Sequence, residues 1–208
     1  MTLEPNDIEA VKKTLCAICG VSAATTKDHI PPRGIFPRPR THDLITVPAC
    51  RPCNHKISKT EEEFRVYLSL AVGFDGDAAS KLWSKEALPT LSRNKRLAWG
   101  LRKSMRSVLV TTPAGIILGE RTAGHWPASA HDPVIEKMIR GLYFHHFAEI
   151  LGDRVIINVQ YQRKLNADML QLCAEMPIGG RLADGAFEYR CARAKESPLH
   201  SIWIFAFY

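Results

Sequence analysis

The sequence lacks any long hydrophobic run. Its apolar stretches, such as residues 202–208, extend over only a few residues, whereas a membrane-spanning helix needs about 20. The first residues, MTLEPNDIEA, have neither the basic start nor the apolar centre of a secretory signal. No internal repeat or low-complexity tract is present. With 46% hydrophobic and 24% charged residues, the composition is that of an ordinary soluble globular protein, which we expect in the cytoplasm.

Acidic residues are scarce in one segment. Between Lys81 and Arg106 the chain has a single acid, Glu86, against eight basic residues: Lys81, Lys85, Arg93, Lys95, Arg96, Arg102, Lys103 and Arg106. This segment can account for the whole net charge of +7. Such an imbalance favours an anionic partner, above all nucleic acid. The alternative is a solvated helix face opposite an apolar stripe of leucines.

Cysteine is present in a pattern that favours a metal. Four of the six cysteines form two pairs, Cys16-Ala-Ile-Cys19 and Cys50-Arg-Pro-Cys53. In a reducing compartment such pairs bind metal more often than they form disulfides, and two pairs together predict a structural four-thiolate zinc site. A redox role for one pair is the alternative. Cys173 and Cys191 stand apart, and we interpret them as core residues.

The hydrophobic pattern predicts an α+β protein. Helices are expected at about 4–15, from residue 53 or 54, and at 61–72, 77–87, 91–106, 133–151 and 165–175. Strands are expected at 26–30, 44–47, 107–112, 115–120, 154–160, 186–192 and 201–207, with the third and fourth forming a hairpin. Glycines near residue 75 suggest two domains, 1–75 and 76–208.

Asp28 and His29 lie between the two cysteine pairs, and Asn54 directly follows the last cysteine. A zinc ion that joins the pairs would also bring Asn54 toward Asp28 and His29. A carboxylate oxygen and an amide oxygen suit a catalytic cation such as Mg²⁺ or Mn²⁺. His29 is suited to take a proton from an attacking water, and Pro31-Pro32 stiffens the backbone after it. The pattern therefore favours metal-assisted phosphodiester hydrolysis.

These residues resemble the HNH nuclease family, whose fold is the ββα-metal module. The resemblance covers about residues 16–59 and is carried by four segments: CAIC (16–19), KDHIPP (27–32), DLITVPAC (43–50) and CRPCNHKISK (50–59). It is nearest to the branch with a four-cysteine zinc site, which includes phage junction-resolving endonucleases and modification-dependent restriction nucleases. The C-terminal region, 76–208, has no recognised fold.

The resemblance implies a role for each residue of the site. His29 would be the general base, Asp28 a ligand of the catalytic cation, and Asn54 the second ligand, with His55 as a rival for that place. One position departs from the family: Asp43 stands where the family usually has an asparagine that holds the histidine loop by hydrogen bonds. An aspartate accepts such bonds but cannot donate them.

The expected function is therefore that of an HNH endonuclease hydrolysing DNA, where the choice of DNA follows from the resemblance alone. Candidate contacts to nucleic acid are Arg33, Lys56, Lys59, Arg96 and Lys103. A homodimer is possible on this interpretation, and no membrane contact is expected. The alternatives are a zinc-stabilised nucleic-acid-binding protein with a degenerate site, and a regulatory protein whose C-terminal region binds a ligand or partner.

Overall fold

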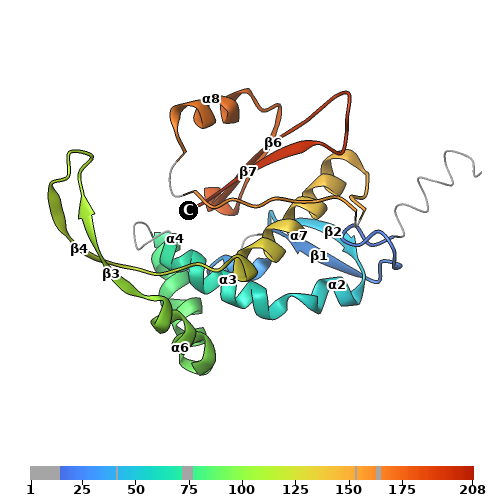
Figure 1. Ribbon diagram of the computed structural model, residues 1–208. Helices are drawn as coiled ribbons and strands as arrows, with labels where there is room; N and C mark the ends of the chain where they lie inside the picture. Colours follow the sequence, from blue (N-terminus) through green and yellow to red (C-terminus); the bar gives the residue numbers. More distant parts are fainter. Residues whose placement is uncertain (1–14, 41, 72–76, 153, 163–164) are drawn as a thin grey trace, which may run out of the picture.

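The computed structural model describes residues 15–40, 42–71, 77–152, 154–162 and 165–208, which form a mixed α and β structure (Figure 1). The strands are β1 (Thr26–Ile30), β2 (Ile45–Ala49), β3 (Arg106–Thr111), β4 (Ile117–Ala123), β5 (Ile178–Leu182), β6 (Phe187–Arg193) and β7 (Ser201–Phe207). The α-helices are α2 (Arg51–Lys56), α3 (Ser58–Ala71), α4 (Asp77–Lys81), α5 (Leu88–Arg93), α6 (Lys95–Ser104), α7 (Ala128–Phe147) and α8 (Ala167–Glu175). Short helical turns are η1 (Arg33–Ile35), η2 (Leu82–Ala87, π-helical) and η3 (Ala183–Gly185).

Most predicted elements are confirmed, one predicted strand is wrong, and one observed strand was missed. Residues 154–160 form no strand in the part that the structure describes, and β5 (Ile178–Leu182) was not predicted. Two glycines, Gly179 and Gly180, weaken the strand signal of β5. The predicted helix 91–106 is interrupted at Asn94, which caps α6 by accepting a hydrogen bond from the backbone N–H of Leu97. The predicted helix 4–15 lies almost wholly outside the described residues.

The strands form three separate antiparallel sheets. β1 pairs with β2, β3 pairs with β4, and β5, β6 and β7 form a three-stranded sheet in that order. In the first sheet Asp28 lies opposite Val47 and His29 opposite Thr46. Among the described residues, no helix is both long and apolar enough to cross a membrane.

Helix α7 lies between the β1–β2 sheet and the sheet of β6 and β7 (Figure 1). Its buried residues Val134, Met138 and Leu142 belong to the same hydrophobic cluster as Phe64 of α3 and Phe187 of β6. This core therefore contains residues from both sides of the predicted domain boundary near residue 75. Through it, α7 is packed directly behind the strand that carries Asp28 and His29.

Gly141 of α7 lies where the helix crosses β1, and the approach leaves no room for a side chain. A Cβ atom at Gly141 would lie 2.5 Å from Cγ1 of Ile30, whose side chain is fully buried. We therefore expect Gly141→Ala to lower the free energy of unfolding by about 1–3 kcal/mol, the usual cost of overpacking a core. Urea unfolding followed by circular dichroism measures the change.

Gly100 is the matched control for this prediction. It lies on the exposed side of α6, and no atom lies within 4 Å of the position of its Cβ. Gly100→Ala should raise the free energy of unfolding by about 0.5–1 kcal/mol, because alanine favours the helix. If both variants were stabilised alike, the close contact between α7 and β1 would be wrong.

Candidate functional site

The four paired cysteines come together at the end of the β1–β2 sheet. Cys16 precedes a turn in which Gly20 donates its N–H to the Cys16 carbonyl, and Gly20 has a positive φ of 68°. Cys50 and Cys53 lie at the start of α2, which begins directly after β2. The Sγ atoms of Cys16, Cys19, Cys50 and Cys53 all lie within 4.8 Å of one another.

This cluster has the dimensions of a tetrahedral metal site. The Sγ atoms of Cys19 and Cys50 are 4.0 Å apart, well beyond disulfide length. Zinc–sulfur bonds of about 2.3 Å in a tetrahedron place the sulfurs about 3.8 Å apart. Burial opposes ionisation of Cys19, but the backbone N–H groups of Ser22 and Val21 outweigh it and lower the pKa of the thiol to about 6. Four thiols this close favour a bound cation, and zinc fits the donor set.

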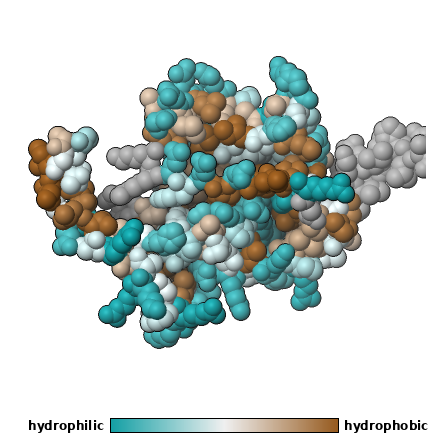
Figure 2. Space-filling model, viewed as in Figure 1, coloured by the Kyte–Doolittle hydropathy of each residue, from teal (hydrophilic) through white to brown (hydrophobic). Residues whose placement is uncertain are grey.

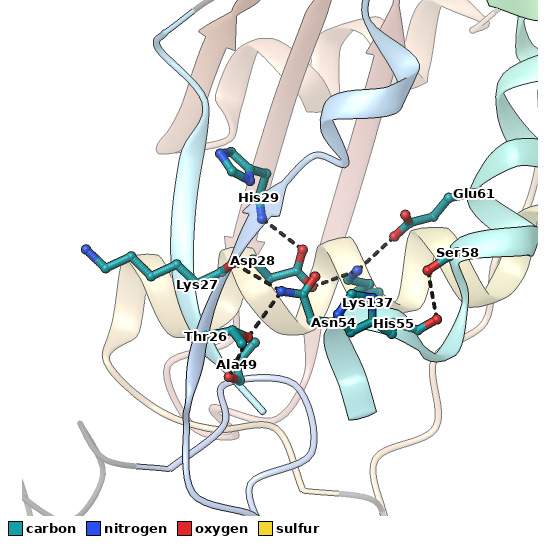
Figure 3. Close-up of polar contacts among 10 residues, drawn as sticks. All are labelled: Thr26, Lys27, Asp28, His29, Ala49, Asn54, His55, Ser58, Glu61 and Lys137. Atoms are coloured by element: carbon teal, nitrogen blue, oxygen red, sulfur yellow. Dashed lines mark hydrogen bonds and ion pairs between the residues drawn. The ribbon is translucent and has the colours of Figure 1, made fainter. Parts of the chain in front are cut away.

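Alternation along β1 directs the two central side chains to opposite faces of the strand. Asp28 faces inward and is buried, with 6% of its surface exposed, while His29 is half-buried on the other face with Lys27. In Figure 3 the His29 ring points away from the Asp28 carboxylate. The backbone N–H of His29 nevertheless donates a hydrogen bond of 2.9 Å to Oδ1 of Asp28.

Asp28 is also paired with a buried lysine. The ammonium group of Lys137, from α7, lies 2.7 Å from Oδ2 of Asp28 and 2.8 Å from Oε1 of Glu61 (Figure 3). Lys137 is 4% exposed. Burial disfavours its charge, but Glu61 and Asp28 together outweigh burial and raise the pKa of Lys137. The group of two carboxylates and one ammonium, which we call the buried triad, has a formal charge of −1.

Asn54 of α2 is fixed against β1 beside this triad. Its Nδ2 atom donates hydrogen bonds to Oγ1 of Thr26 at 3.1 Å and to the Lys27 carbonyl at 3.2 Å (Figure 3). Thr26 in turn donates to the Ala49 carbonyl at 2.9 Å. Since both bonds use the nitrogen, the amide oxygen of Asn54 is the atom that can serve as a ligand. The Asn54 side chain thus lies against Thr26 and Lys27, the two residues before Asp28 in β1, while the His29 ring lies on the other face.

The surroundings of His29 favour its neutral form. Burial is the largest effect and lowers the pKa of the imidazole, and the positive charge of Arg33 lowers it further against the opposing effect of Asp28. A neutral imidazole at neutral pH is the form that accepts a proton.

The remaining predicted residues occupy different places. Asp43, just before β2, accepts a hydrogen bond of 2.9 Å from the backbone N–H of Ala183, which ties its loop to the C-terminal region. The basic residues Arg33, Lys56 and Lys59 are exposed on the elements next to the site, as is His55. Arg96 and Lys103 lie on α6, which is separated from β1 in Figure 1 and packs against α3.

Sequence reasoning missed Lys137 and Glu61 as members of the site. Glu61 lies at the start of the predicted helix 61–72, and Lys137 lies in the predicted helix 133–151. A single lysine among apolar positions at helical spacing is the only signal that could have pointed to a buried ion pair. Nothing in the sequence identifies Asp28 as its partner.

Comparisons with known proteins do not extend these observations. A scan against protein-family models, a search of curated proteins and a search of solved structures each found no match to this chain.

Proposed function

We propose that the chain is a metal-dependent HNH endonuclease that hydrolyses phosphodiester bonds of DNA. The observation that carries the proposal is the position of Asn54. Two hydrogen bonds from its Nδ2 atom to β1 fix an amide oxygen next to the strand position of Asp28. Asp28 and Asn54 are held in these positions by the antiparallel β1–β2 pair and by α2, which follows it. The four-cysteine cluster lies where the sheet and the helix meet.

The charge of the buried triad supports a divalent cation at Asp28. Two carboxylates against one ammonium leave one negative charge in a poorly solvated place, and a nearby cation offsets it. The oxygens of Asp28 and Asn54 suit Mg²⁺ or Mn²⁺. Such a cation would stabilise negative charge on the phosphate and on the leaving oxygen. Because Lys137 contacts Oδ2 of Asp28, the cation has to share that carboxylate with the ammonium or displace it.

In this proposal His29 accepts the proton of the attacking water. Its half-buried ring is neutral and lies near the exposed Arg33, which would contact a phosphate of the substrate. Catalytic hydrogen bonds are commonly long or misaligned before the substrate binds, so the outward ring has to turn toward the phosphate on binding. Lys56 and Lys59 can contact neighbouring phosphates from the start of the helical segment.

The direct test is cleavage of supercoiled plasmid by the zinc-loaded protein with Mg²⁺ or Mn²⁺. We expect nicked or linear product that is lost with EDTA. His29→Ala should lower the rate about 10²–10⁴-fold, the usual contribution of a general base, while zinc content and DNA binding persist. His200→Ala, at an exposed histidine just before β7 and outside the site, is the matched control and should cut at a rate close to that of the unmodified protein. Equal cleavage rates for the His29 and His200 variants would show that His29 takes no part in the chemistry.

The ion pair of Lys137 favours a second candidate. An ammonium already bound to Asp28 can replace a catalytic cation, and the His29 ring faces away from it. On this basis the chain would be a zinc-stabilised nucleic-acid-binding protein with a degenerate site. It would bind plasmid but leave it intact with every divalent cation tested.

A further inference from the structure

The hairpin of β3 and β4 projects from the body of the molecule and carries an apolar end (Figure 1). Four aliphatic side chains near its turn are more than half exposed: Leu109 (63%), Ile116 (64%), Ile117 (61%) and Leu118 (67%). Figure 2 shows these apolar residues gathered at the far end of the hairpin. An isolated two-stranded hairpin with such a surface is marginally stable in water, which points to a binding partner.

The apolar residues occupy both faces of the hairpin. In the register of the strands Thr111 lies opposite Ile117, so Leu109 and Ile117 share one face, while Val110 lies on the other face opposite Gly119. A flat partner covers only one face of a hairpin. The distribution therefore fits a site that surrounds the end of the hairpin on both sides.

The base of the hairpin is basic. Arg106 begins β3, Arg121 lies opposite Val108 in β4, and both are exposed. Residues 88–131 contain seven basic residues, Arg93, Lys95, Arg96, Arg102, Lys103, Arg106 and Arg121, against one acid, Glu120. The carboxylate of Glu120 accepts a hydrogen bond from the Ser107 hydroxyl. Because α6 ends at Ser104, just before β3, its exposed basic residues lie at the base of the same hairpin.

We propose that this hairpin is a wedge that enters a groove of DNA and inserts its apolar end between base pairs, while the basic residues at its base bind the flanking phosphates. The proposal rests on the proposed function, which makes DNA the substrate. The major groove admits a two-stranded β-ribbon. In proteins that bind the minor groove, apolar side chains are inserted between base steps and unstack them.

The length of the hairpin fits a DNA groove. From the pair Val108–Arg121 to the pair Thr111–Ile117, β3 advances three residues and β4, which is bulged here, advances four. At about 3.3 Å per residue the advance along β3 is roughly 10 Å, comparable with groove depths of about 7.5–8.5 Å. An arginine at a phosphate therefore allows the apolar end to reach the base pairs.

The test measures binding and base unstacking without cleavage. The zinc-loaded protein, with no Mg²⁺ or Mn²⁺ added, is titrated into duplex DNA that carries 2-aminopurine in place of several adenines, with anisotropy reporting binding and 2-aminopurine fluorescence reporting unstacking. We expect a rise in fluorescence on binding. The double variant Ile117→Ser/Leu118→Ser should abolish that rise and weaken binding about tenfold, with the salt dependence unchanged.

Two further variants complete the design. Arg106→Ala/Arg121→Ala should weaken binding and reduce the slope of log K against log salt by about 1.8, since each phosphate contact contributes about 0.9. Leu170→Ser is the matched control, because Leu170 of α8 is 57% exposed and lies outside the hairpin. It should bind and unstack DNA like the unmodified protein.

Several outcomes would overturn the wedge. Unchanged fluorescence and affinity in the Ile117/Leu118 variant would show that the apolar end does not enter DNA. If that variant instead lost binding to phosphatidylserine vesicles, or lost a dimer seen by analytical ultracentrifugation, while still binding DNA normally, the partner would be a membrane or a second copy of the chain. Plasmid cleavage is scored separately. If the protein cleaves plasmid but does not unstack bases, only the proposal of a DNA-inserting hairpin is wrong. If it unstacks bases but does not cleave, only the proposed nuclease activity is wrong.

Discussion

Changing Cys53 to serine is expected to abolish zinc binding and to unfold the segment that contains β1, β2 and α2. The four sulfurs lie within 4.8 Å of one another, and the cluster joins the turn before β1 to the start of α2. A structural zinc site contributes about 10–16 kcal/mol in small zinc peptides, which equals or exceeds the whole stability of a typical domain at about 5–15 kcal/mol. The loss of one ligand should therefore lower the free energy of unfolding by more than the segment can lose and remain folded.

Metal analysis and circular dichroism check this prediction. The unmodified protein should contain about one zinc per chain, and the variant should contain almost none, with a lower helix content and a lower melting temperature. Cys173→Ser is the matched control, because Cys173 lies on α8 outside the cluster and is partly exposed. It should retain zinc and melt close to the unmodified protein. A Cys53 variant that kept a full zinc load would exclude the four-thiolate site.

The cysteine cluster was predictable because its signal is local and chemical. Two CxxC pairs leave few alternatives for four thiols, and the prolines and β-branched residues around them predict the two strands. Helices with clear apolar stripes, such as α3 and α7, were predictable for the same reason. The hairpin of β3 and β4 followed from Ala114-Gly115 between two β-branched segments.

The surroundings of Asp28 were not predictable, because they depend on how distant elements pack. The position of Lys137 is set by α7 crossing β1 at Gly141, a contact that no local pattern indicates. Trp99 of α6 is a second example, since its side chain is 61% exposed with the Lys103 ammonium 4.0 Å from its ring centre. Helical periodicity predicts which residues share one face of a helix, but it does not predict which face packs against a neighbouring element.

Lys137→Met is expected to destabilise the protein strongly in the absence of divalent cations and to tighten cation binding. Removing the ammonium leaves the carboxylates of Asp28 and Glu61 close together and unpaired, with Asp28 only 6% exposed. Breaking a buried ion pair in this way typically costs about 3–5 kcal/mol. Urea unfolding of the zinc-loaded protein, with no other divalent cation added, measures the loss. Lys56→Met, at an exposed lysine on α2, is the matched control and should change stability by less than about 0.5 kcal/mol.

The same variant tests whether Lys137 and a divalent cation compete for Asp28. In the zinc-loaded variant, Mn²⁺ should bind more tightly than in the unmodified protein, because the two freed carboxylates attract it and no ammonium has to be displaced. Calorimetry measures the affinity, and Mn²⁺ should restore much of the lost stability by binding only the folded state. The double variant Lys137→Met/Glu61→Gln removes one carboxylate with the ammonium, so the zinc-loaded protein should regain stability without Mn²⁺ and lose part of the gain in Mn²⁺ affinity. If Mn²⁺ bound all three proteins equally, Asp28 would not be a cation ligand, and the lysine would be a structural partner alone.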